Sequence, residues 1–372
     1  MSYSKNQINK AGRKLADVGS STDDISSSMD VLSYWRLCRE KPLETAFAPL
    51  QRIAAKIDRD AIFAKRLKRT ASIILKLRRS EGRMQLGRMQ DVGGCRAIIS
   101  TEKKLRKIVR EYKKIPELRT TGGLVRINDY IESPKSDGYR SVHIVGKFKN
   151  ENNESRNIEI QVRTRIQHYW ATAVEIVDLF TGQALKSNQG EQEWKDFFAA
   201  ASRQFALMEK VHVFSQLKYQ HQFDEYSKIV RKNADLMNDC MVVKQLADSV
   251  GALKRLEAFS SSLKIIDDHL NGFSNAGYVL LVINTQERSV SPTVYESKDS
   301  THAEKAYIKL EKETIDDPTM VVALVSSAAV GGIKAAYPNY FADSTEFLKL
   351  LNIIENVKSP DQRGLFQRII GL

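Results

Sequence analysis

Apolar residues recur every three or four positions through the first eighty residues, which is the spacing of amphipathic helices. This pattern predicts helices at 4–16, 30–39, about 44–65 and 66–79. Pro42 is expected to end the second helix. Pro49 is expected near the first turn of the third helix, where proline is tolerated.

One face of the helix predicted at 66–79 is polar. Helical spacing places Lys68, Ser72, Lys76 and Arg79 on one stripe, next to an apolar stripe that faces the core. Three cations and a hydroxyl group have the chemistry to hold a triphosphate. A solvated charged face has the same spacing, so the pattern alone leaves both interpretations open.

Strand patterns begin after residue 92. Apolar runs and alternations predict strands at 93–100, 124–128, 141–149 and 157–163, with a basic helix at 102–114. Alternating strands and helices predict an α/β domain with a mixed sheet flanked by helices.

The chain from 166 to 270 is predicted to be helical, and glycine and small polar residues at 272–277 mark a boundary. Beyond it we expect a small C-terminal α+β domain. Its predicted strands are 278–284, 289–295 and 320–326, and its predicted helices are 301–314, 333–337 and 344–357. The expected domains are an N-terminal helical extension at 1–65, the α/β domain at 66–215, a helical connector at 216–271 and the C-terminal domain at 272–372.

Composition narrows the possible functions. The 372 residues include 58 Lys and Arg against 45 Asp and Glu, so the net charge is +13. That balance favours a polyanionic partner, and a basic surface without a partner remains the alternative. Cys38, Cys95 and Cys240 form no CxxC pair, so neither a disulfide framework nor a zinc site is predicted. With no signal peptide and no long apolar run, we expect a cytoplasmic protein that does not bind a membrane.

The helix predicted at 102–114 is the most basic segment. Its apolar stripe should pack on the sheet and turn the cations outward, as a patch for tRNA. The cations are Lys103, Lys104, Arg106, Lys107, Arg110, Lys113 and Lys114.

Candidate catalytic residues lie where the predicted strands begin. In the strand at 157–163, alternation places Glu159, Gln161 and Arg163 on the face opposite the apolar residues. Asp91 precedes a Gly-Gly pair at 93–94, where the backbone lets a ligand approach closely. Two carboxylates on adjacent strand ends can hold a magnesium ion against phosphate oxygens. One of them can also take a proton from an attacking hydroxyl group.

Three motifs carry a resemblance to a known family. They are Arg-Met-Gln-Asp-Val-Gly-Gly-Cys-Arg at 88–96, Asp-Tyr-Ile-Glu-Ser-Pro-Lys-Ser-Asp-Gly-Tyr-Arg-Ser-Val-His at 129–143 and Glu-Ile-Gln-Val-Arg-Thr at 159–164. From about Arg66 to Glu175 the sequence resembles the RelA/SpoT nucleotidyltransferases, which have the alarmone synthetase fold. The resemblance implies an ATP-dependent pyrophosphokinase, which binds Mg2+ with ATP and moves the β,γ-pyrophosphate to a ribose 3′-hydroxyl.

The resemblance also implies roles for single residues. Asp91 would bind the metal, and Glu159 would assist it and activate the acceptor hydroxyl. Tyr139, expected to be exposed, would stack on the acceptor base. The residues that hold ATP would be Arg66, Lys68, Ser72, Lys76 and Arg96. The acceptor pocket would also contain Lys135, His143, Gln161 and Arg163.

Two departures from the family pattern limit these roles. Glu175 is followed by Ile176, where the family often has a Glu-His pair. The His-Asp metal pair of the family's hydrolase half is also missing upstream. We therefore expect no alarmone hydrolase.

The resemblance leaves the acceptor open. Some family members modify GDP or GTP, whereas others are toxins that transfer pyrophosphate to the 3′-terminal adenosine of tRNA and stop translation. The basic helix and the net charge favour tRNA. A (p)ppGpp synthetase is the alternative, and a catalytically inactive RNA-binding member is a further one.

The N-terminal helix, Trp35, the chain length and the C-terminal domain resemble the fused toxin–antitoxin type called CapRel. In that type the C-terminal domain blocks the ATP site until a phage protein releases it. We expect a phage capsid protein to bind the C-terminal domain here. Tyr337 and Tyr340 form a Tyr-x-x-Tyr that we expect to plug the ATP site, and an ordinary core position for both rings is the alternative.

Overall fold

The structure is a computed structural model in which the chain forms two compact units. The first is Met1–Ser133 with Arg140–Arg165, and the second is Pro134–Tyr139 with Ile166–Leu372. The residues described are 3–68, 70–80, 83–120, 124–150, 153–181, 185, 190–270, 276–284, 286–287, 289–314, 317, 319–326 and 340–358.

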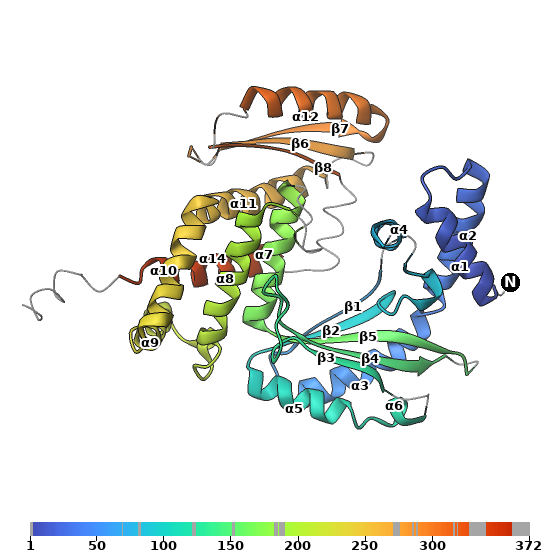
Figure 1. The fold of residues 1–372 in the computed structure, drawn as a ribbon, viewed down its shortest axis with the longest axis horizontal. Coiled ribbons are helices and arrows are strands. Elements are labelled where there is room, and N and C mark those ends of the chain that lie inside the picture. The colour runs from blue at the N-terminus through green and yellow to red at the C-terminus, as the bar shows by residue number, and fades with distance from the viewer. Residues whose placement is uncertain are drawn as a thin grey trace, which may run out of the picture. The chain divides into compact units, whose positions relative to one another are not determined.

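A five-stranded mixed sheet forms the centre of the first unit (Figure 1). Its strands are β1 (Ile62–Leu67), β2 (Gly93–Ile99), β3 (Leu124–Asp129), β4 (Val142–Lys149) and β5 (Ser155–Thr164), in the order β1-β2-β5-β4-β3. Strands β2 and β5 are parallel, and the other neighbours are antiparallel. The predicted mixed sheet is confirmed.

Helices α3 (Glu40–Ile57) and α5 (Glu102–Tyr112) pack against one face of this sheet. Their apolar residues share a core with the inward-facing residues of β2, β4 and β5, and burying each such side chain contributes about 1.5–3 kcal/mol. Members of this core include Leu50, Leu105, Ile108, Ile144 and Ile160. The short helix α6 (Pro116–Thr120) follows α5.

A second, smaller core joins the N-terminal helices to the segment that precedes β2. It lies between α1 (Lys5–Ala16), α2 (Thr22–Leu37), α4 (Thr70–Arg79) and the 3-10 turn η1 (Leu86–Arg88). The side chains that fill it include Ile8, Leu32, Ile73, Leu86 and Val92. Because Val92 belongs to this core, the N-terminal helices fix the start of β2, where Asp91 is located.

The prediction of one helix from about 44 to 65 is wrong. Helix α3 ends at Ile57, and β1 follows and pairs with β2. The carboxylate of Asp58 is buried and accepts hydrogen bonds from the backbone N–H of Ser100 (2.7 Å) and from Nζ of Lys104 (2.9 Å). These bonds tie the helix end to the far end of β2, and the chain then returns along β2 as a strand.

The two proline predictions are also wrong. Pro42 lies in the first turn of α3 and therefore does not act as the end of the preceding helix. The N–H groups of a first turn have no partner within the helix, so the N–H that proline lacks costs no helical hydrogen bond there. Pro49 lies in the interior of α3 and removes one helical hydrogen bond. Burial of the stripe that contains Phe47, Leu50 and Ala54 offsets that loss.

The second unit is largely helical. Its helices are α7 (Arg165–Thr181), α8 (Gln192–Met208), α9 (Tyr219–Val230), α10 (Ala234–Ser249), α11 (Ala252–Leu270) and α14 (Tyr340–Glu355). Aromatic rings occupy their shared core, and Phe347 of α14 lies 5.3 Å from Phe205 of α8 between ring centroids. A buried polar contact also anchors α14, because Nε2 of His168 lies 2.9 Å from Oδ2 of Asp343.

A three-stranded antiparallel sheet completes the second unit. Its strands β6 (Ala276–Asn284), β7 (Ser289–Glu296) and β8 (Met320–Ser326) run in the order β7-β6-β8, with α12 (Ser300–Thr314) packed on it. The predicted small α+β fold is confirmed, although α14 packs with the helices and not on this sheet. The helix predicted at 333–337 lies outside the described residues. Within the part of the chain that is described, no helix is long and apolar enough to cross a membrane.

Candidate active site

Two ammonium groups contact one carboxylate directly before β2. Nζ of Lys68 and Nζ of Lys76 each lie 2.8 Å from Oδ2 of Asp91. Burial raises the pKa of Asp91, but the two positive charges outweigh it and lower the pKa to about 2. Asp91 is therefore ionised at neutral pH. Its other oxygen, Oδ1, is buried and has no hydrogen-bond partner among the described residues.

The two lysines reach Asp91 from different elements. The prediction that Lys68 lies on the same helix as Lys76 is wrong, because α4 begins only at Thr70. Lys68 follows β1, and its backbone N–H donates to the carbonyl of Val92 at 2.6 Å. This bond holds Lys68 beside the start of β2, so the two side chains converge without sharing a helical stripe.

The carboxylate of Glu159 on β5 is held at both oxygens. Nδ1 of His143 lies 3.1 Å from Oε1, and Nε2 of Gln161 donates to Oε2 at 2.9 Å. Burial raises the pKa of Glu159, and so does the like negative charge of Asp91. The contacts with His143 and Gln161 outweigh both and lower the pKa of Glu159 below its usual value. The two carboxylates therefore act on each other electrostatically, and both are ionised at neutral pH.

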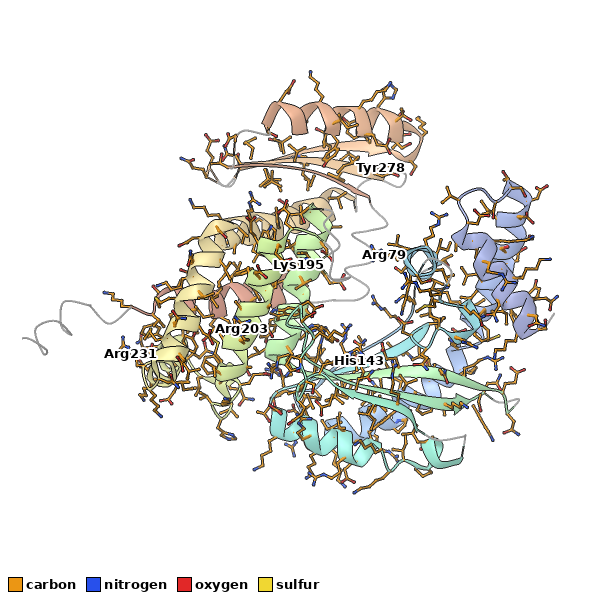
Figure 2. All side chains as sticks on the ribbon, viewed as in Figure 1. Arg79, His143, Lys195, Arg203, Arg231 and Tyr278 are labelled. Atoms are coloured by element: carbon orange, nitrogen blue, oxygen red, sulfur yellow. The ribbon has the colours of Figure 1, made fainter. Side chains whose placement is uncertain are left out.

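The register of the sheet brings these side chains together. Gly94 of β2 is opposite Glu159 of β5, and on the other side of β5 His143 of β4 is opposite Gln161. Nε of Arg96 donates to Oε1 of Gln161 at 3.2 Å. Figure 2 labels His143 on this sheet. The sequence motifs predicted His143 in the acceptor pocket, but its contact with Glu159 depends on a register that the motifs do not contain.

The remaining residues predicted to hold ATP lie on three elements, with Arg66 on β1, Ser72 on α4 and Arg96 on β2. Arg66 lies on β1 opposite Gly94. Ser72 is exposed on α4, as is Arg79, which Figure 2 labels. Arg163, predicted for the acceptor pocket, lies near the end of β5 and is only 1% exposed. It could contact an acceptor only if the acceptor reached this buried side chain.

The loop that carries Lys135 and Tyr139 belongs to the second unit. The backbone N–H of Gly138 donates to the carbonyl of Lys135 at 2.9 Å, and Gly138 has φ +89°, a conformation that favours glycine. Nζ of Lys135 lies 5.0 Å from the ring centroid of Tyr139. The expectation that Tyr139 is exposed is wrong, because the ring is half-buried and lies edge-on to Trp170 at 6.3 Å between centroids.

The basic helix α5 divides into paired and unpaired cations. Lys104 contacts Asp58, Arg106 contacts Glu102 and Asp129, and Lys114 contacts Glu111. The others are exposed and have no intramolecular partner among the described residues, and these are Lys103, Lys107, Arg110 and Lys113. Lys103, Lys107 and Arg110 lie at helical spacing on one outward stripe, which we call the α5 stripe.

The predicted plug falls largely outside what the structure describes. Tyr337 is outside the described residues. Tyr340 begins α14, but its side chain is outside the described part of the chain.

The donor set at Asp91 and Glu159 suits a magnesium ion that is also held by phosphate. Both residues offer carboxylate oxygens, the ligands that Mg2+ prefers, and Oδ1 of Asp91 is buried without a partner among the described residues. Across those residues, no group of three or more His, Cys, Asp or Glu could hold a metal by itself. Two carboxylate ligands with further positions left open would suit a metal that binds together with a nucleotide.

Comparison with known proteins finds a family whose conserved region is similar to the segment that contains this site. A family model described as "Region found in RelA / SpoT proteins" matches residues 65–176. GTP pyrophosphokinase YwaC of Bacillus subtilis (strain 168) is 32% identical over 114 residues, which are 29% of this chain and 52% of that protein. The chain thus spans about half the length of this curated relative.

Solved structures of small alarmone synthetases also match. Small alarmone synthetase 1 of Bacillus subtilis bound to its product pppGpp is 24% identical, with 40% of this chain and 74% of that chain covered and a TM-score of 0.35. Another crystal structure of the same synthetase is 21% identical, with 49% and 93% covered and a TM-score of 0.41. The region matched by the family model, residues 65–176, contains Asp91, Arg96, His143 and Glu159, and over this region the chain is similar to RelA/SpoT proteins.

Proposed function

We propose that the protein is a magnesium-dependent pyrophosphokinase that moves the β,γ-pyrophosphate of ATP to a ribose 3′-hydroxyl. The observation that carries this proposal is the contact of two lysines with Asp91, next to a second ionised carboxylate at Glu159. In the reaction the acceptor oxygen forms a bond to the β-phosphorus. The bond from that phosphorus to the α-phosphate oxygen breaks, and AMP leaves.

The lysines and Asp91 fit the binding of a polyphosphate. When bound, a magnesium ion would add positive charge at the phosphate oxygens, with Asp91 and Glu159 as its protein ligands. Lys68 and Lys76 already neutralise Asp91 in the free protein, so binding of ATP would transfer their ammonium groups to phosphate oxygens.

Glu159 fits the orientation of the acceptor hydroxyl. Because its pKa is lowered, Glu159 is a weak base at neutral pH. Phosphoryl transfer passes through a loose transition state and depends mainly on positioning and electrostatics. A carboxylate fixed by His143 and Gln161 can accept a hydrogen bond from the hydroxyl group and take its proton late in the reaction.

We favour the 3′-terminal adenosine of tRNA as the acceptor. The α5 stripe supports this choice, because three exposed cations at helical spacing match a run of backbone phosphates, whereas a free nucleotide needs only a local pocket. Modification of this adenosine would block aminoacylation and stop translation. The second candidate is GDP or GTP, which is supported by the name of the relative, GTP pyrophosphokinase.

A labelled-phosphate assay separates the two acceptors. The protein is incubated with ATP labelled at the γ-phosphate and with either bulk tRNA or GDP plus GTP. We expect label on tRNA, and label on guanosine nucleotides alone would replace tRNA by the second candidate. Absence of label on both acceptors, with the activating partner supplied, would refute the pyrophosphokinase proposal.

The α5 stripe provides a sharper test of tRNA binding. A variant with Lys103→Gln, Lys107→Gln and Arg110→Gln should bind tRNA more weakly and lower the salt-dependence slope by about one for each lost phosphate contact. Arg52→Gln with Lys56→Gln on exposed α3 positions is the matched control. Unchanged tRNA affinity and slope in the triple variant would remove the support that α5 gives to tRNA.

We further propose that the protein is a cytoplasmic, autoinhibited toxin that arrests growth when a phage capsid protein binds its C-terminal domain. The three free cysteines suit a reducing compartment. Deletion of residues 272–372 would be a poor test, because it would remove α14, and with it Phe347, from the helical core. Tyr337→Ala with Tyr340→Ala in the full chain tests the plug directly, with Tyr295→Ala on β7 as the control. We expect higher basal activity in the double variant, and unchanged activity would contradict a tyrosine plug.

A further inference from the structure

A buried arginine without an anionic partner lies behind the start of β2. Arg39 is only 2% exposed, and no carboxylate of the described residues forms an ion pair with it. Its side chain packs beside Gly93, where an added Cβ would lie 3.2 Å from Cβ of Arg39. Burial, and then the positive charge of Arg156, lower the pKa of the Arg39 guanidinium to about 9. A buried cation near a second cation is costly unless an anion compensates it.

Three buried N–H donors in this cluster lack acceptors. They are Nε of Arg39, Nε of Arg156 and Nε1 of Trp35, and none has a hydrogen-bond partner in the described structure. The Arg39 guanidinium carbon lies 3.8 Å from the centroid of the Trp35 ring, and that of Arg156 lies 5.6 Å from it. Unsatisfied buried donors are rare in native proteins, so three in one cluster indicate a missing acceptor.

The surroundings of the cluster also favour a negative ligand. Helix α3 begins at Glu40 directly after Arg39 and has no side-chain cap, so its N-terminus adds partial positive charge. Glu154 contacts Nη2 of Arg156 at 3.3 Å but does not contact Arg39. Trp35 is half-buried and 19% of the Arg156 side chain is exposed, so solvent reaches the edge of the cluster, whereas Arg39 is buried.

We propose that Arg39, Arg156 and Trp35 form a second binding site, for a phosphate-type oxyanion. Nη1 of Arg39 already donates to the carbonyl of Trp35, and Nη1 and Nη2 of Arg156 donate to Ser155 and Glu154. The donors left for a ligand include the two Nε–H groups and the indole N–H, and charge-assisted N–H bonds of this kind hold phosphate oxygens. The site differs from the one at Asp91, because it is built on α2, the residue that precedes α3 and the start of β5, and uses neither Lys68 nor Lys76. Free phosphate or pyrophosphate, or the phosphate of a nucleotide, would supply this oxyanion.

The test uses the full chain in a Lys76→Met background, which weakens phosphate binding at Asp91. Inorganic phosphate, pyrophosphate and ADP are titrated separately at constant ionic strength, while thermal denaturation and tryptophan fluorescence are followed. We expect each effective ligand to raise the melting temperature and to change a fluorescence signal that is lost in Trp35→Phe. A response to pyrophosphate would show that a free oxyanion is sufficient. A response to ADP alone would show that the site requires a nucleotide phosphate.

Substitutions of the arginines distinguish a binding site from ordinary packing. Arg39→Met should raise the melting temperature without ligand, because it removes an uncompensated buried charge, and should abolish the ligand-induced rise. Arg156→Gln at the exposed edge should weaken binding by about tenfold or more, the loss expected for a charge-assisted hydrogen bond. Arg52→Met, an exposed position on α3, is the control and should change neither quantity.

The proposal is overturned if none of the three ligands binds, or if binding is the same in wild-type, Arg39→Met and Arg156→Gln proteins. If Arg39→Met does not fold, Arg156→Gln still decides the question. Pyrophosphate transfer to tRNA or guanosine nucleotides is measured separately, so failure of the second site does not count against the proposed reaction.

Discussion

Replacement of Lys76 by methionine should have opposite effects on two kinds of metal binding. In the free protein Lys76 and Lys68 neutralise Asp91, and the same charges repel a free divalent cation. Lys76→Met removes one of these charges and keeps the length of the side chain. We therefore expect tighter binding of the free metal ion but weaker binding of the metal–ATP complex, because ATP loses a cationic partner for its phosphates.

The magnitude follows from the pKa of Asp91, which the surroundings lower from 3.8 to about 2. At 1.36 kcal/mol per pKa unit, the folded protein favours ionised Asp91 by about 2 kcal/mol. The two lysines also offset the rise in pKa that burial causes, so each of them, at the same 2.8 Å from Oδ2, accounts for at least half of this preference. Loss of one charge should thus change the affinity of the free metal ion by at least about fivefold, since half of the preference is about 1 kcal/mol and a factor of ten corresponds to about 1.4 kcal/mol.

Manganese is a suitable probe, because bound and free Mn2+ differ in their paramagnetic resonance signal. The titration is carried out without nucleotide and then with ATP, on wild-type protein, Lys76→Met and Lys103→Met. Lys103 is exposed on α5, so its substitution should change neither titration. Equal or weaker binding of free Mn2+ to Lys76→Met would refute the view that the lysines compete with the metal for Asp91.

Three further predictions concern Asp91 and the loop that carries Tyr139. Asp91→Asn and Tyr139→Ala should each abolish pyrophosphate transfer and growth arrest while circular dichroism stays native, and an active Asp91→Asn protein would contradict the enzymatic proposal. Because the folded-state pKa of Asp91 is lowered, its ion pairs stabilise the fold above pH 3.8. This contribution of about 2 kcal/mol should disappear as the pH falls toward about 2. In pH-dependent denaturation, an Asp91→Asn protein should lack that part of the acid sensitivity. In thermal denaturation, Gly138→Ala should destabilise the protein by about 1–2 kcal/mol, because φ is +89° and the new Cβ would lie 2.8 Å from Cα of Ala199. Gly19→Ala is the control and should be neutral in the same measurement.

The central strands could be predicted because their patterns are local. Alternation along β5 places Glu159 and Gln161 on one face, and the structure shows both side chains in contact there. The contact between His143 and Glu159 could not be predicted, because it depends on the register of β4 against β5. A shift by one residue would place His143 on the other face of the sheet.

The strand β1 was missed because a short amphipathic segment fits more than one pattern. The residues from Ile62 to Leu67 extend the apolar spacing of the preceding helix, and only the buried bond from Ser100 to Asp58 shows that the helix ends at Ile57. This contact spans 42 positions in the sequence. Tertiary contacts of this kind override local propensity, and they also place Lys68 in a loop and not on a helix.

The cations around the start of β2 are balanced very differently on its two sides. At Asp91 two lysines share one carboxylate, so that cluster carries a net charge of only one and is stable without ligand. Asp91 also acts on Arg39, but it is not in contact with Arg39 and its charge is already neutralised by the lysines. Arg39 therefore gains little from Asp91, and Glu154 compensates only Arg156. Because none of the described residues places an anion in contact with Arg39, a ligand is the simplest source of one, and the stability of Arg39→Met with and without phosphate measures that deficit directly.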